Sequence, residues 1–231
     1  WRDHPDPYAV WVSEIMLQQT QVETVRGYFA RFMQAFPTVA ALAAAQQQQV
    51  LKLWEGLGYY TRARNLQRAA QQIVTQGGGL PRDVAGWAAL PGVGAYTAAA
   101  IASICFGVPA PVVDGNVIRV FARYLGWDDD FRKPAARARL AAWLQPRIAA
   151  SGRPGDFNQA MMDLGAVLCT PQAPGCARCP LRGGCVARRE GRQAALPARP
   201  VRQAVPTRSA VAVLARDAAG RVLLVQRAPD G

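Results

Sequence analysis

The chain has 231 residues, 51% of them hydrophobic, and carries 27 basic against 15 acidic residues, which gives a net charge of +12 and a pI near 10.4. This length allows one or two domains with a sizeable core, and the sequence contains neither a membrane-length apolar run nor a signal peptide. The charge favours nucleic acid as a partner, then an anionic membrane surface, although a basic proteome gives the same balance; the single histidine argues against Ser-His-Asp catalysis and multi-histidine metal sites.

Helical patterns fill most of the first 168 residues. Asp6 followed by Pro7 is typical of a helix cap with proline at the first helical position, and predicts a long helix or a helix pair through Phe36. Glycine- and proline-rich turns separate further predicted helices over residues 38–54, 59–76, 82–90, 94–106, 115–126, 134–150 and 156–168. In the first of these, the run Gln46–Gln49 is expected to be a solvated helix face. The sequence therefore predicts a mainly α fold.

The composition changes after the helical part. Residues 191–206 are rich in Arg, Ala and Pro without an apolar period, which indicates a linker. The segment SAVAVLARDAAGRVLLVQR then alternates like two strands around a turn at Asp217–Gly220. Two strands alone are marginally stable, so we expect residues 207–231 to be the truncated start of a second, β-containing domain. The start at Trp1, without methionine, likewise suggests a trimmed product or a fragment.

Glu14 is the first candidate for acid–base chemistry. In AVWVSEIMLQQTQV its helical neighbours include Val10, Trp11 and Leu17, so it lies on a largely apolar face. Burial there would raise its pKa and keep it protonated near neutral pH, as a general acid requires. The alternative is a glutamate at the rim with its carboxylate in water.

Two aspartates also stand out. Asp114 follows Val112-Val113 and precedes a predicted helix, so we expect it to cap that helix. A capping aspartate is held ionised and oriented, which also suits stabilisation of a nearby cation. Asp163, in FNQAMMDLGAVLC, lies on a helix rich in apolar residues, where a buried and hydrogen-bonded polar residue is the alternative to a functional one.

The segment LPGVGAYTAAAI, from Leu90 to Ile101, predicts a helix–turn–helix with a glycine-rich turn. Glycine allows positive φ and close approach of a partner. The amides that open the second helix are unpaired and form a seat for phosphate. Gly92, Val93 and Gly94 are therefore candidates for DNA-phosphate contact, with an ordinary helix–helix turn as the alternative.

Four cysteines, spaced C-x6-C-x2-C-x5-C, lie at Cys169, Cys176, Cys179 and Cys185. Zinc ribbons usually pair two C-x2-C knuckles or add histidines, whereas this loop has one knuckle and no histidine nearby. The spacing favours an iron–sulfur cluster and leaves zinc open. A disulfide framework is less expected in a helical chain without a secretion signal. The fifth cysteine, Cys105, is expected to be an inert core residue.

Several long motifs occur in one order along residues 1–190: WVSEIMLQQTQV, LWEGLGYYTRARNL, LPGVGAYTAAAI, VVDGNVIRV, FNQAMMDLGAVLC and the cysteine loop. Together they resemble the adenine DNA glycosylases of the MutY type, in the endonuclease III helix–hairpin–helix superfamily. The resemblance implies a two-lobed helix–hairpin–helix glycosylase domain over residues 1–190, with a [4Fe–4S] cluster loop at residues 169–185. It also implies that residues 207–231 begin a Nudix-like domain.

The resemblance implies base-excision repair, in which adenine mispaired with 8-oxoguanine or guanine is flipped into a pocket and removed, leaving an abasic site. Glu14 would protonate the adenine at N7, and Asp114 would stabilise or transiently trap the oxocarbenium cation. Tyr96 and Asn116 would support and position these groups. The implied substrate-binding residues are Trp1, Arg2, Leu17 and Asp163 around the adenine, Gln18 and Gln19 in the wedge, and Leu57 and Tyr59 beside the 8-oxoguanine. Some relatives have glutamate where this chain has Asp163.

By the same resemblance, the four cysteines hold a [4Fe–4S] cluster with a structural and DNA-positioning role. Its loop would offer basic side chains to the DNA backbone, namely Arg178, Arg182, Arg188 and Arg189. The implied partner is double-stranded DNA with an A:8-oxoguanine or A:G mismatch. The implied protein is a monomer associated with the nucleoid in a bacterial cytoplasm.

The sequence leaves three other functions open. A bifunctional endonuclease III-like glycosylase/AP lyase needs an amine for its Schiff base. In those relatives a lysine lies in the hairpin-helix region, where this chain has Tyr96, and its only lysines are Lys52 and Lys133, outside the motifs above. A non-catalytic iron–sulfur DNA-binding protein would bind without releasing a base. A zinc-stabilised basic helical domain would be colourless.

Overall fold

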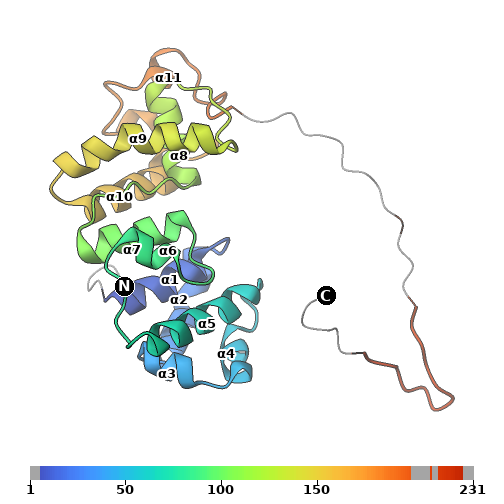
Figure 1. Ribbon diagram of the computed structural model, residues 1–231. Coiled ribbons are helices and arrows are strands. Elements are labelled where there is room, and N and C mark those ends of the chain that lie inside the picture. Colours follow the sequence, from blue (N-terminus) through green and yellow to red (C-terminus); the bar gives the residue numbers. More distant parts are fainter. Residues whose placement is uncertain (1–5, 199–208, 210–212, 226–231) are drawn as a thin grey trace. The chain divides into compact units, whose positions relative to one another are not determined.

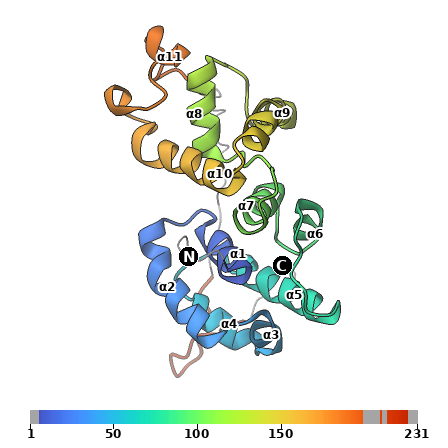
Figure 2. The same ribbon diagram turned by 90° about the vertical axis from the view of Figure 1, so that its left-hand side faces the viewer.

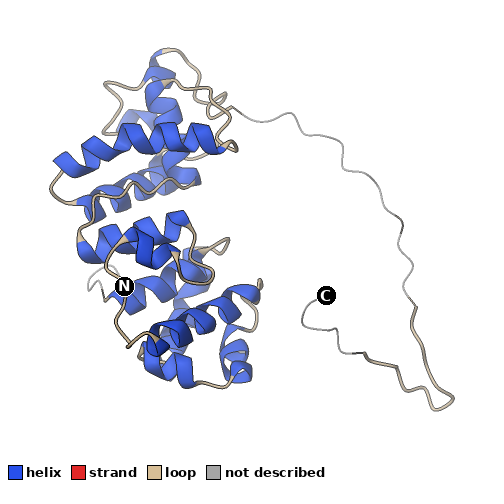
Figure 3. Ribbon diagram, in the orientation of Figure 1, coloured by secondary structure: helices blue, strands red, loops and turns tan. Residues whose placement is uncertain are grey.

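The computed structural model describes residues 6–198, 209 and 213–225. The chain divides into two compact units, Trp1–Arg199 and Pro200–Gly231, and all helices of the described residues belong to the first. Helices and loops account for that unit (Figure 3), which confirms the mainly α prediction for the described residues. None of these helices is both long and apolar enough to cross a membrane.

The first lobe of the helical unit packs around one central helix. Its elements are α1 (Pro7–Leu17), α2 (Val22–Ala35), α3 (Val39–Ala44), α4 (Gln47–Trp54), α5 (Thr61–Thr75), α6 (Val84–Ala88) and α7 (Ala95–Phe106). Helix α1 contacts α2, α5 and α7, so almost every side of it is covered (Figure 1). That position explains why α1 is apolar on nearly all faces instead of carrying a polar stripe.

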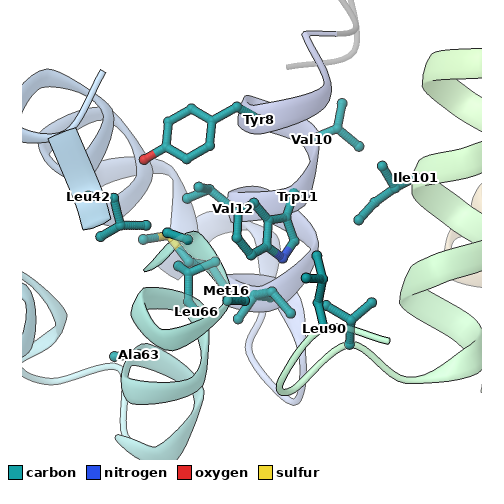
Figure 4. Close-up of a cluster of buried hydrophobic side chains, with 14 of the residues drawn as sticks. Tyr8, Val10, Trp11, Val12, Met16, Leu42, Ala63, Leu66, Leu90 and Ile101 are labelled. Atoms are coloured by element: carbon teal, nitrogen blue, oxygen red, sulfur yellow. The ribbon is translucent and has the colours of Figure 1, made fainter. Parts of the chain in front are cut away.

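The core of this lobe forms around the side chains of α1. Trp11 is fully buried and its ring lies 5.5 Å from that of Trp87 in a tilted arrangement. In Figure 4, α1 side chains such as Met16 lie between Leu66 on one side and Leu90 on the other. The predicted cap is confirmed, since Asp6 Oδ2 accepts a 2.8 Å hydrogen bond from the amide of Ala9.

The second lobe follows after the hairpin helix α7. Its elements are α8 (Gly115–Leu125), α9 (Pro134–Ala150), α10 (Pro154–Asp163), a π-helical turn (Leu164–Leu168), a 3-10 turn (Cys176–Arg178) and α11 (Val186–Arg189). This lobe has its own hydrophobic core, which includes Phe121, Leu140 and Leu144. The lobes meet where α7 packs against α10, as both ribbon views show (Figures 1 and 2).

Most predicted helices are present within a few residues of their expected bounds, and α9 matches its bounds completely. The single predicted helix over residues 38–54 is wrong, because the chain breaks at Ala45–Gln46 into α3 and α4. Gln46 has an extended backbone, and its amide donates a 3.3 Å hydrogen bond to Oε1 of Gln49. The exposed glutamine run therefore starts a helix instead of continuing one.

The second unit is described by residues 209 and 213–225. The predicted turn at Asp217–Gly220 is confirmed: the amide of Gly220 donates a 3.0 Å hydrogen bond to the carbonyl of Asp217. The two predicted strands are wrong for the described residues, which form only one antiparallel bridge, between Arg216 and Val222. Leu224 is 88% exposed, so the apolar alternation has no partner surface in this segment. The remaining residues of that prediction lie outside the described ranges.

Trp11→Ala tests the central role of α1. Removing this fully buried ring leaves a large cavity, so we expect a loss of about 3–5 kcal/mol in the free energy of unfolding. Val74→Ala is the control, since Val74 is 42% exposed on α5 and its truncation should change stability by no more than about 0.5 kcal/mol. Chemical denaturation followed by circular dichroism measures both, and equal effects of the two substitutions would contradict the prediction.

Candidate active site

A cleft opens between the two lobes and brings together eight of the fifteen residues predicted for catalysis, substrate binding and phosphate contact. It is lined by residues of α1, α5, α7, α8 and α9, by three loops of the first lobe and by Asp114, which precedes α8. The lining residues are Glu14, Leu17, Gln18, Gln19, Tyr59, Thr61, Arg62, Asn65, Gly92, Tyr96, Asp114, Gly115 and Arg137. Residues more than a hundred positions apart in the chain thus share one surface.

Glu14 is buried on α1, with 7% of its surface exposed, as the apolar face of this helix predicts. The hydroxyl of Tyr96, from α7, donates a 3.0 Å hydrogen bond to Oε2 of Glu14. The same hydroxyl lies 3.6 Å from the sulfur of Met162 on α10. The carboxyl group therefore lies buried at the inner wall of the cleft, beside the hydroxyl of Tyr96.

Asp114 lies across from this group, at the start of the second lobe. It caps α8, as predicted: its Oδ1 accepts a 2.7 Å hydrogen bond from the amide of Val117. Its Oδ2 accepts a 3.1 Å hydrogen bond from Nδ2 of Asn116. Both oxygens of Asp114 are thus held by donors at the start of α8. The cleft therefore combines one buried carboxyl group with one capped carboxylate.

Arg119 supports this carboxylate from behind, a role that the sequence analysis missed. Its Nη2 donates 2.7 Å hydrogen bonds to Oδ1 of Asn116 and to the carbonyl of Gly165, and its Nε donates one of 2.7 Å to the carbonyl of Cys169. Burial lowers the pKa of Arg119, and the nearby Cys169 and Asp114 partly offset this lowering. Gly165 allows this close packing, because a Cβ there would lie 2.6 Å from Cβ of Asn116.

The hairpin turn lies at the edge of the same cleft. Gly92 lines it with φ of 76°, and a Cβ at this position would lie 2.7 Å from Cβ of Asn65. Gly94 begins α7, and no described side chain caps that helix. The first-turn amides of α7 therefore remain available to an anion. Val93, in contrast, is buried and packs in the core.

Two non-glycine residues of the cleft have a left-handed backbone. Gln19 has φ of 59° and Tyr59 has φ of 48°, and Tyr59 is 64% exposed. The neighbouring Gln18 is fixed, because its Nε2 donates a 3.2 Å hydrogen bond to the hydroxyl of Thr97. Leu57, for which contact with the duplex stays a prediction, is buried in the core of the first lobe.

Arg62, also missed from the sequence, lies between these two loops. Its guanidinium donates to backbone carbonyls at the end of α1 and in the loop before α5, for example to Met16 at 2.9 Å and to Gly58 at 3.2 Å. Burial lowers its pKa, with a smaller opposing effect of Tyr59. The only sequence signal for it is an arginine on a turn of α5 that follows a glycine-rich loop.

The four cysteines of the predicted loop line one largely apolar pocket of the second lobe: Cys169, Cys176, Cys179 and Cys185. All are free thiols. The buried Arg123 lies beside them, with Nη1 3.3 Å from the sulfur of Cys169 and 2.8 Å from the carbonyl of Thr170. No three His, Cys, Asp or Glu side chains in the described ranges come close enough together to bind a single metal ion.

Other predicted residues lie away from the cleft or outside the described ranges. Asp163 closes α10 and is not among the residues that line the cleft. Trp1 and Arg2 lie outside the described residues. The predicted phosphate-facing arginines of the cysteine loop are all exposed: Arg178, Arg182, Arg188 and Arg189. Cys105 packs partly buried against the core, and burial, with Asp6 and Glu14 nearby, raises its pKa to about 12, as expected for an inert thiol.

Comparison with known proteins places this architecture in a family. The sequence model of the HhH-GPD superfamily base excision DNA repair proteins matches residues 12–146. The adenine DNA glycosylase of Rattus norvegicus is 50% identical over 199 residues, which are 84% of this chain and 38% of that protein. The adenine DNA glycosylase of Buchnera aphidicola subsp. Acyrthosiphon pisum is 37% identical over 207 residues, which are 89% of this chain and 59% of that protein. The chain thus spans less than two thirds of the length of these relatives.

Solved structures give the same result for the fold. A thermostable thymine-DNA glycosylase matches with a TM-score of 0.73 and 29% identity, over 82% of this chain and 88% of that one. A non-covalent endonuclease III–DNA complex matches with a TM-score of 0.69 and 26% identity, over 81% of this chain and 86% of that one.

Gly92→Ala tests the geometry of the hairpin turn. The substitution forces a Cβ into Asn65 and strains a backbone with φ of 76°, so we expect a destabilisation of about 1–3 kcal/mol. Gly79→Ala is the matched control, because a Cβ there meets nothing within 4 Å. Thermal unfolding of the two variants compares them, and a Gly92→Ala protein as stable as the control would refute the strained turn.

Proposed function

Because the chain belongs to the HhH-GPD superfamily of base excision DNA repair proteins, we propose that it is a monofunctional adenine DNA glycosylase. Its substrate would be adenine mispaired with 8-oxoguanine or guanine, and its product an abasic site. The observation that carries the proposal is the pairing, in one cleft, of buried Glu14 under the hydroxyl of Tyr96 with the capped carboxylate of Asp114. The relatives named adenine DNA glycosylase support the choice of base.

The two carboxyl groups have complementary roles in this mechanism. Glu14, buried at the wall of the cleft beside the hydroxyl of Tyr96, gives a proton to N7 of the flipped adenine. The protonated adenine then leaves with the electrons of the glycosidic bond. Asp114, whose oxygens are fixed at the start of α8, stabilises the oxocarbenium cation that remains on the sugar. Water adds its hydroxyl to that carbon, releases a proton and completes the abasic site.

The composition of the cleft supports the monofunctional mode. A lyase step needs an amine, and none of the described residues that line the cleft is a lysine. Lys52 is exposed on α4, where it pairs with Glu55 at 2.6 Å, and Lys133 precedes α9. At the start of the hairpin helix the chain offers the hydroxyl of Tyr96 instead of an amine.

Double-stranded DNA is the proposed partner, bound by a monomer in a bacterial cytoplasm. The first-turn amides of α7 provide a phosphate seat, and the net charge of +12 gives long-range attraction. Gln19 and exposed Tyr59 reach the cleft from two loops and would fill and probe the duplex beside the flipped base. The likeness to an endonuclease III–DNA complex agrees with this mode of binding.

A [4Fe–4S] cluster is the proposed cofactor of the cysteine pocket. Four free thiols surround one apolar pocket, and the guanidinium of Arg123 offers positive charge beside Cys169, which suits thiolate ligands. When bound, the cluster would cross-link the loop without taking part in base release. Arg119 connects the loop to Asn116, so an ordered loop helps to hold Asp114 in place.

Glu14→Gln tests the proposed acid. The amide cannot protonate adenine, so the single-turnover rate on a duplex with adenine opposite 8-oxoguanine should fall by about 10²–10⁴-fold. Glu55→Gln is the matched control, since Glu55 pairs with Lys52 on the surface, and should keep the wild-type rate. Strand breakage, measured with and without alkali, reports the abasic product.

Other outcomes of this assay identify the competing functions. Breakage without alkali would establish a lyase. Tight binding without base release in the wild-type protein would establish a non-catalytic DNA-binding protein. A duplex with a T:G mismatch is included because a thymine-DNA glycosylase shares the fold, and release of thymine in place of adenine would refute the proposed substrate.

Cys176→Ser tests the cofactor. Loss of one ligand should remove the brown colour and most of the iron and acid-labile sulfide from the purified protein. Cys105→Ser is the control, because Cys105 packs against the core of the first lobe, and should retain both. Wild-type protein that contains zinc and no iron would replace the cluster with a zinc site.

A further inference from the structure

Two backbone conformations at the cleft need an explanation that the proposed chemistry does not provide. Gln19 and Tyr59 are not glycine, yet both have positive φ, at 59° and 48°. Side chains with a Cβ rarely adopt this conformation, and it persists only where surrounding contacts impose it. Gln19 lies between α1 and α2, and Tyr59 lies between α4 and α5. Contacts from elsewhere in the protein must therefore hold these two loops in their strained backbone conformations.

Arg62 contacts both loops. Its Nη1 donates to the carbonyls of Ile15 at 3.0 Å and Met16 at 2.9 Å, and also to the carbonyl of Gln18. Its Nη2 donates to the carbonyls of Leu57 and Gly58, both at 3.2 Å. A further acceptor is the hydroxyl of Thr20 at 3.3 Å.

The position of these acceptors is what matters for the strain. The carbonyls of Gln18 and Gly58 belong to the peptide groups that directly precede Gln19 and Tyr59. The φ angle of a residue is a rotation about its N–Cα bond, and the preceding peptide plane contains that nitrogen. Holding this plane in place therefore restricts the φ angle that follows it. Arg62 thus acts on the two strained torsions from the same guanidinium group.

The surroundings of Arg62 require an arginine. Helix α1 has no basic residue in its last turn, so its terminal carbonyls receive their cation from Arg62 on α5. The guanidinium also lies 5.4 Å from the ring of buried Trp54 and 5.6 Å from that of Tyr59. A planar fork can serve acceptors on two sides while it packs between rings, whereas a lysine ammonium cannot.

We propose that Arg62 is a positioning residue that holds the loops of Gln19 and Tyr59 in the conformation in which they enter DNA. The role of these loops in DNA rests on the proposed function. We call this set of hydrogen bonds from Arg62 to the two loops the clamp. The clamp is a property of the free protein, because every acceptor of Arg62 is a protein atom.

Hydrogen–deuterium exchange of Arg62→Lys tests the clamp without any assay of activity. We expect the amides of residues 15–20 and 55–60 to exchange about tenfold faster or more, since several charge-assisted hydrogen bonds are lost. Exchange in α9 should not change. Arg68→Lys is the matched control, because Arg68 is exposed on the same helix, and it should match the wild type everywhere. Unchanged exchange in either loop of Arg62→Lys overturns the proposal.

Thr20→Val is a milder second variant in case Arg62→Lys fails to fold. It removes one acceptor of Arg62 and keeps the charge, so it should speed exchange in residues 15–20 alone. Unchanged exchange there would overturn the clamp even without the lysine variant.

A double-mutant cycle then tests the consequence for DNA. In single-turnover excision at saturating duplex, Arg62→Lys should lower the rate about tenfold, and clearly less in a Gln19→Ala background, because its effect passes through Gln19. Equal effects in both backgrounds would refute action through that loop. A wild-type protein that releases no adenine would refute the proposed function alone, while the exchange data would still decide on the clamp.

Discussion

The contact between the two lobes is the constraint on which the cleft depends, because its two carboxyl groups come from different lobes. Asn158 on α10 is 2% exposed and makes this contact specific. Its Nδ2 donates hydrogen bonds to the hydroxyl of Ser103 at 2.9 Å and to the carbonyl of Ala110 at 2.8 Å. Its Oδ1 accepts a 3.2 Å hydrogen bond from the amide of Val112. A buried amide with its groups satisfied fixes both distance and rotation, since any shift would leave one of them unpaired. Val112 is two residues before Asp114, so the same amide determines where the capped carboxylate lies relative to Glu14. Gly155 brings the backbones together, since a Cβ there would lie 2.8 Å from the carbonyl oxygen of Ser103.

From this contact, the environment of each carboxyl group follows from ordinary protein chemistry. Glu14 lies on a helix that is covered on nearly all sides, so its carboxyl group is buried beside the hydroxyl of Tyr96. Asp114 lies at a helix terminus, where the amides of Val117 and Asn116 donate to its two oxygens. The two carboxyl groups therefore have different surroundings in the free protein. The π-helical turn at Leu164–Leu168 extends this support, because it packs Gly165 against Asn116 and leads directly into the first cysteine of the loop.

Features encoded by local pattern could be predicted from the sequence, and features encoded by distant contacts could not. The burial of Glu14 follows from its neighbours three and four residues away, and the cap at Asp114 follows from its place before a helix. Arg62 and Asn158 act on atoms more than 40 residues away, and no periodicity signals such contacts. Leu57 was expected beside the 8-oxoguanine only through the family resemblance, and its burial in the core of the first lobe is likewise not signalled by any local pattern. The alternation of residues 209–227 predicted two strands. Alternation shows which side chains share a face, but a sheet also needs a surface to pack against, and the described residues of this segment form only one bridge.

The location of Arg62 also connects the two steps of the proposed reaction. Its acceptors include the carbonyls of Ile15 and Met16, the two residues that follow Glu14 on α1. The same side chain therefore sets the end of the helix that carries the acid and the loop that carries Gln19. Because these hydrogen bonds exist in the free protein, no binding free energy has to be used to order the loops when DNA binds. The acid is also already positioned relative to the loops before the duplex binds. In the proposed mechanism, the first lobe thus holds the side chains that open the base stack and the group that protonates the base in one fixed arrangement. Only Asp114 is contributed by the second lobe, across the interface.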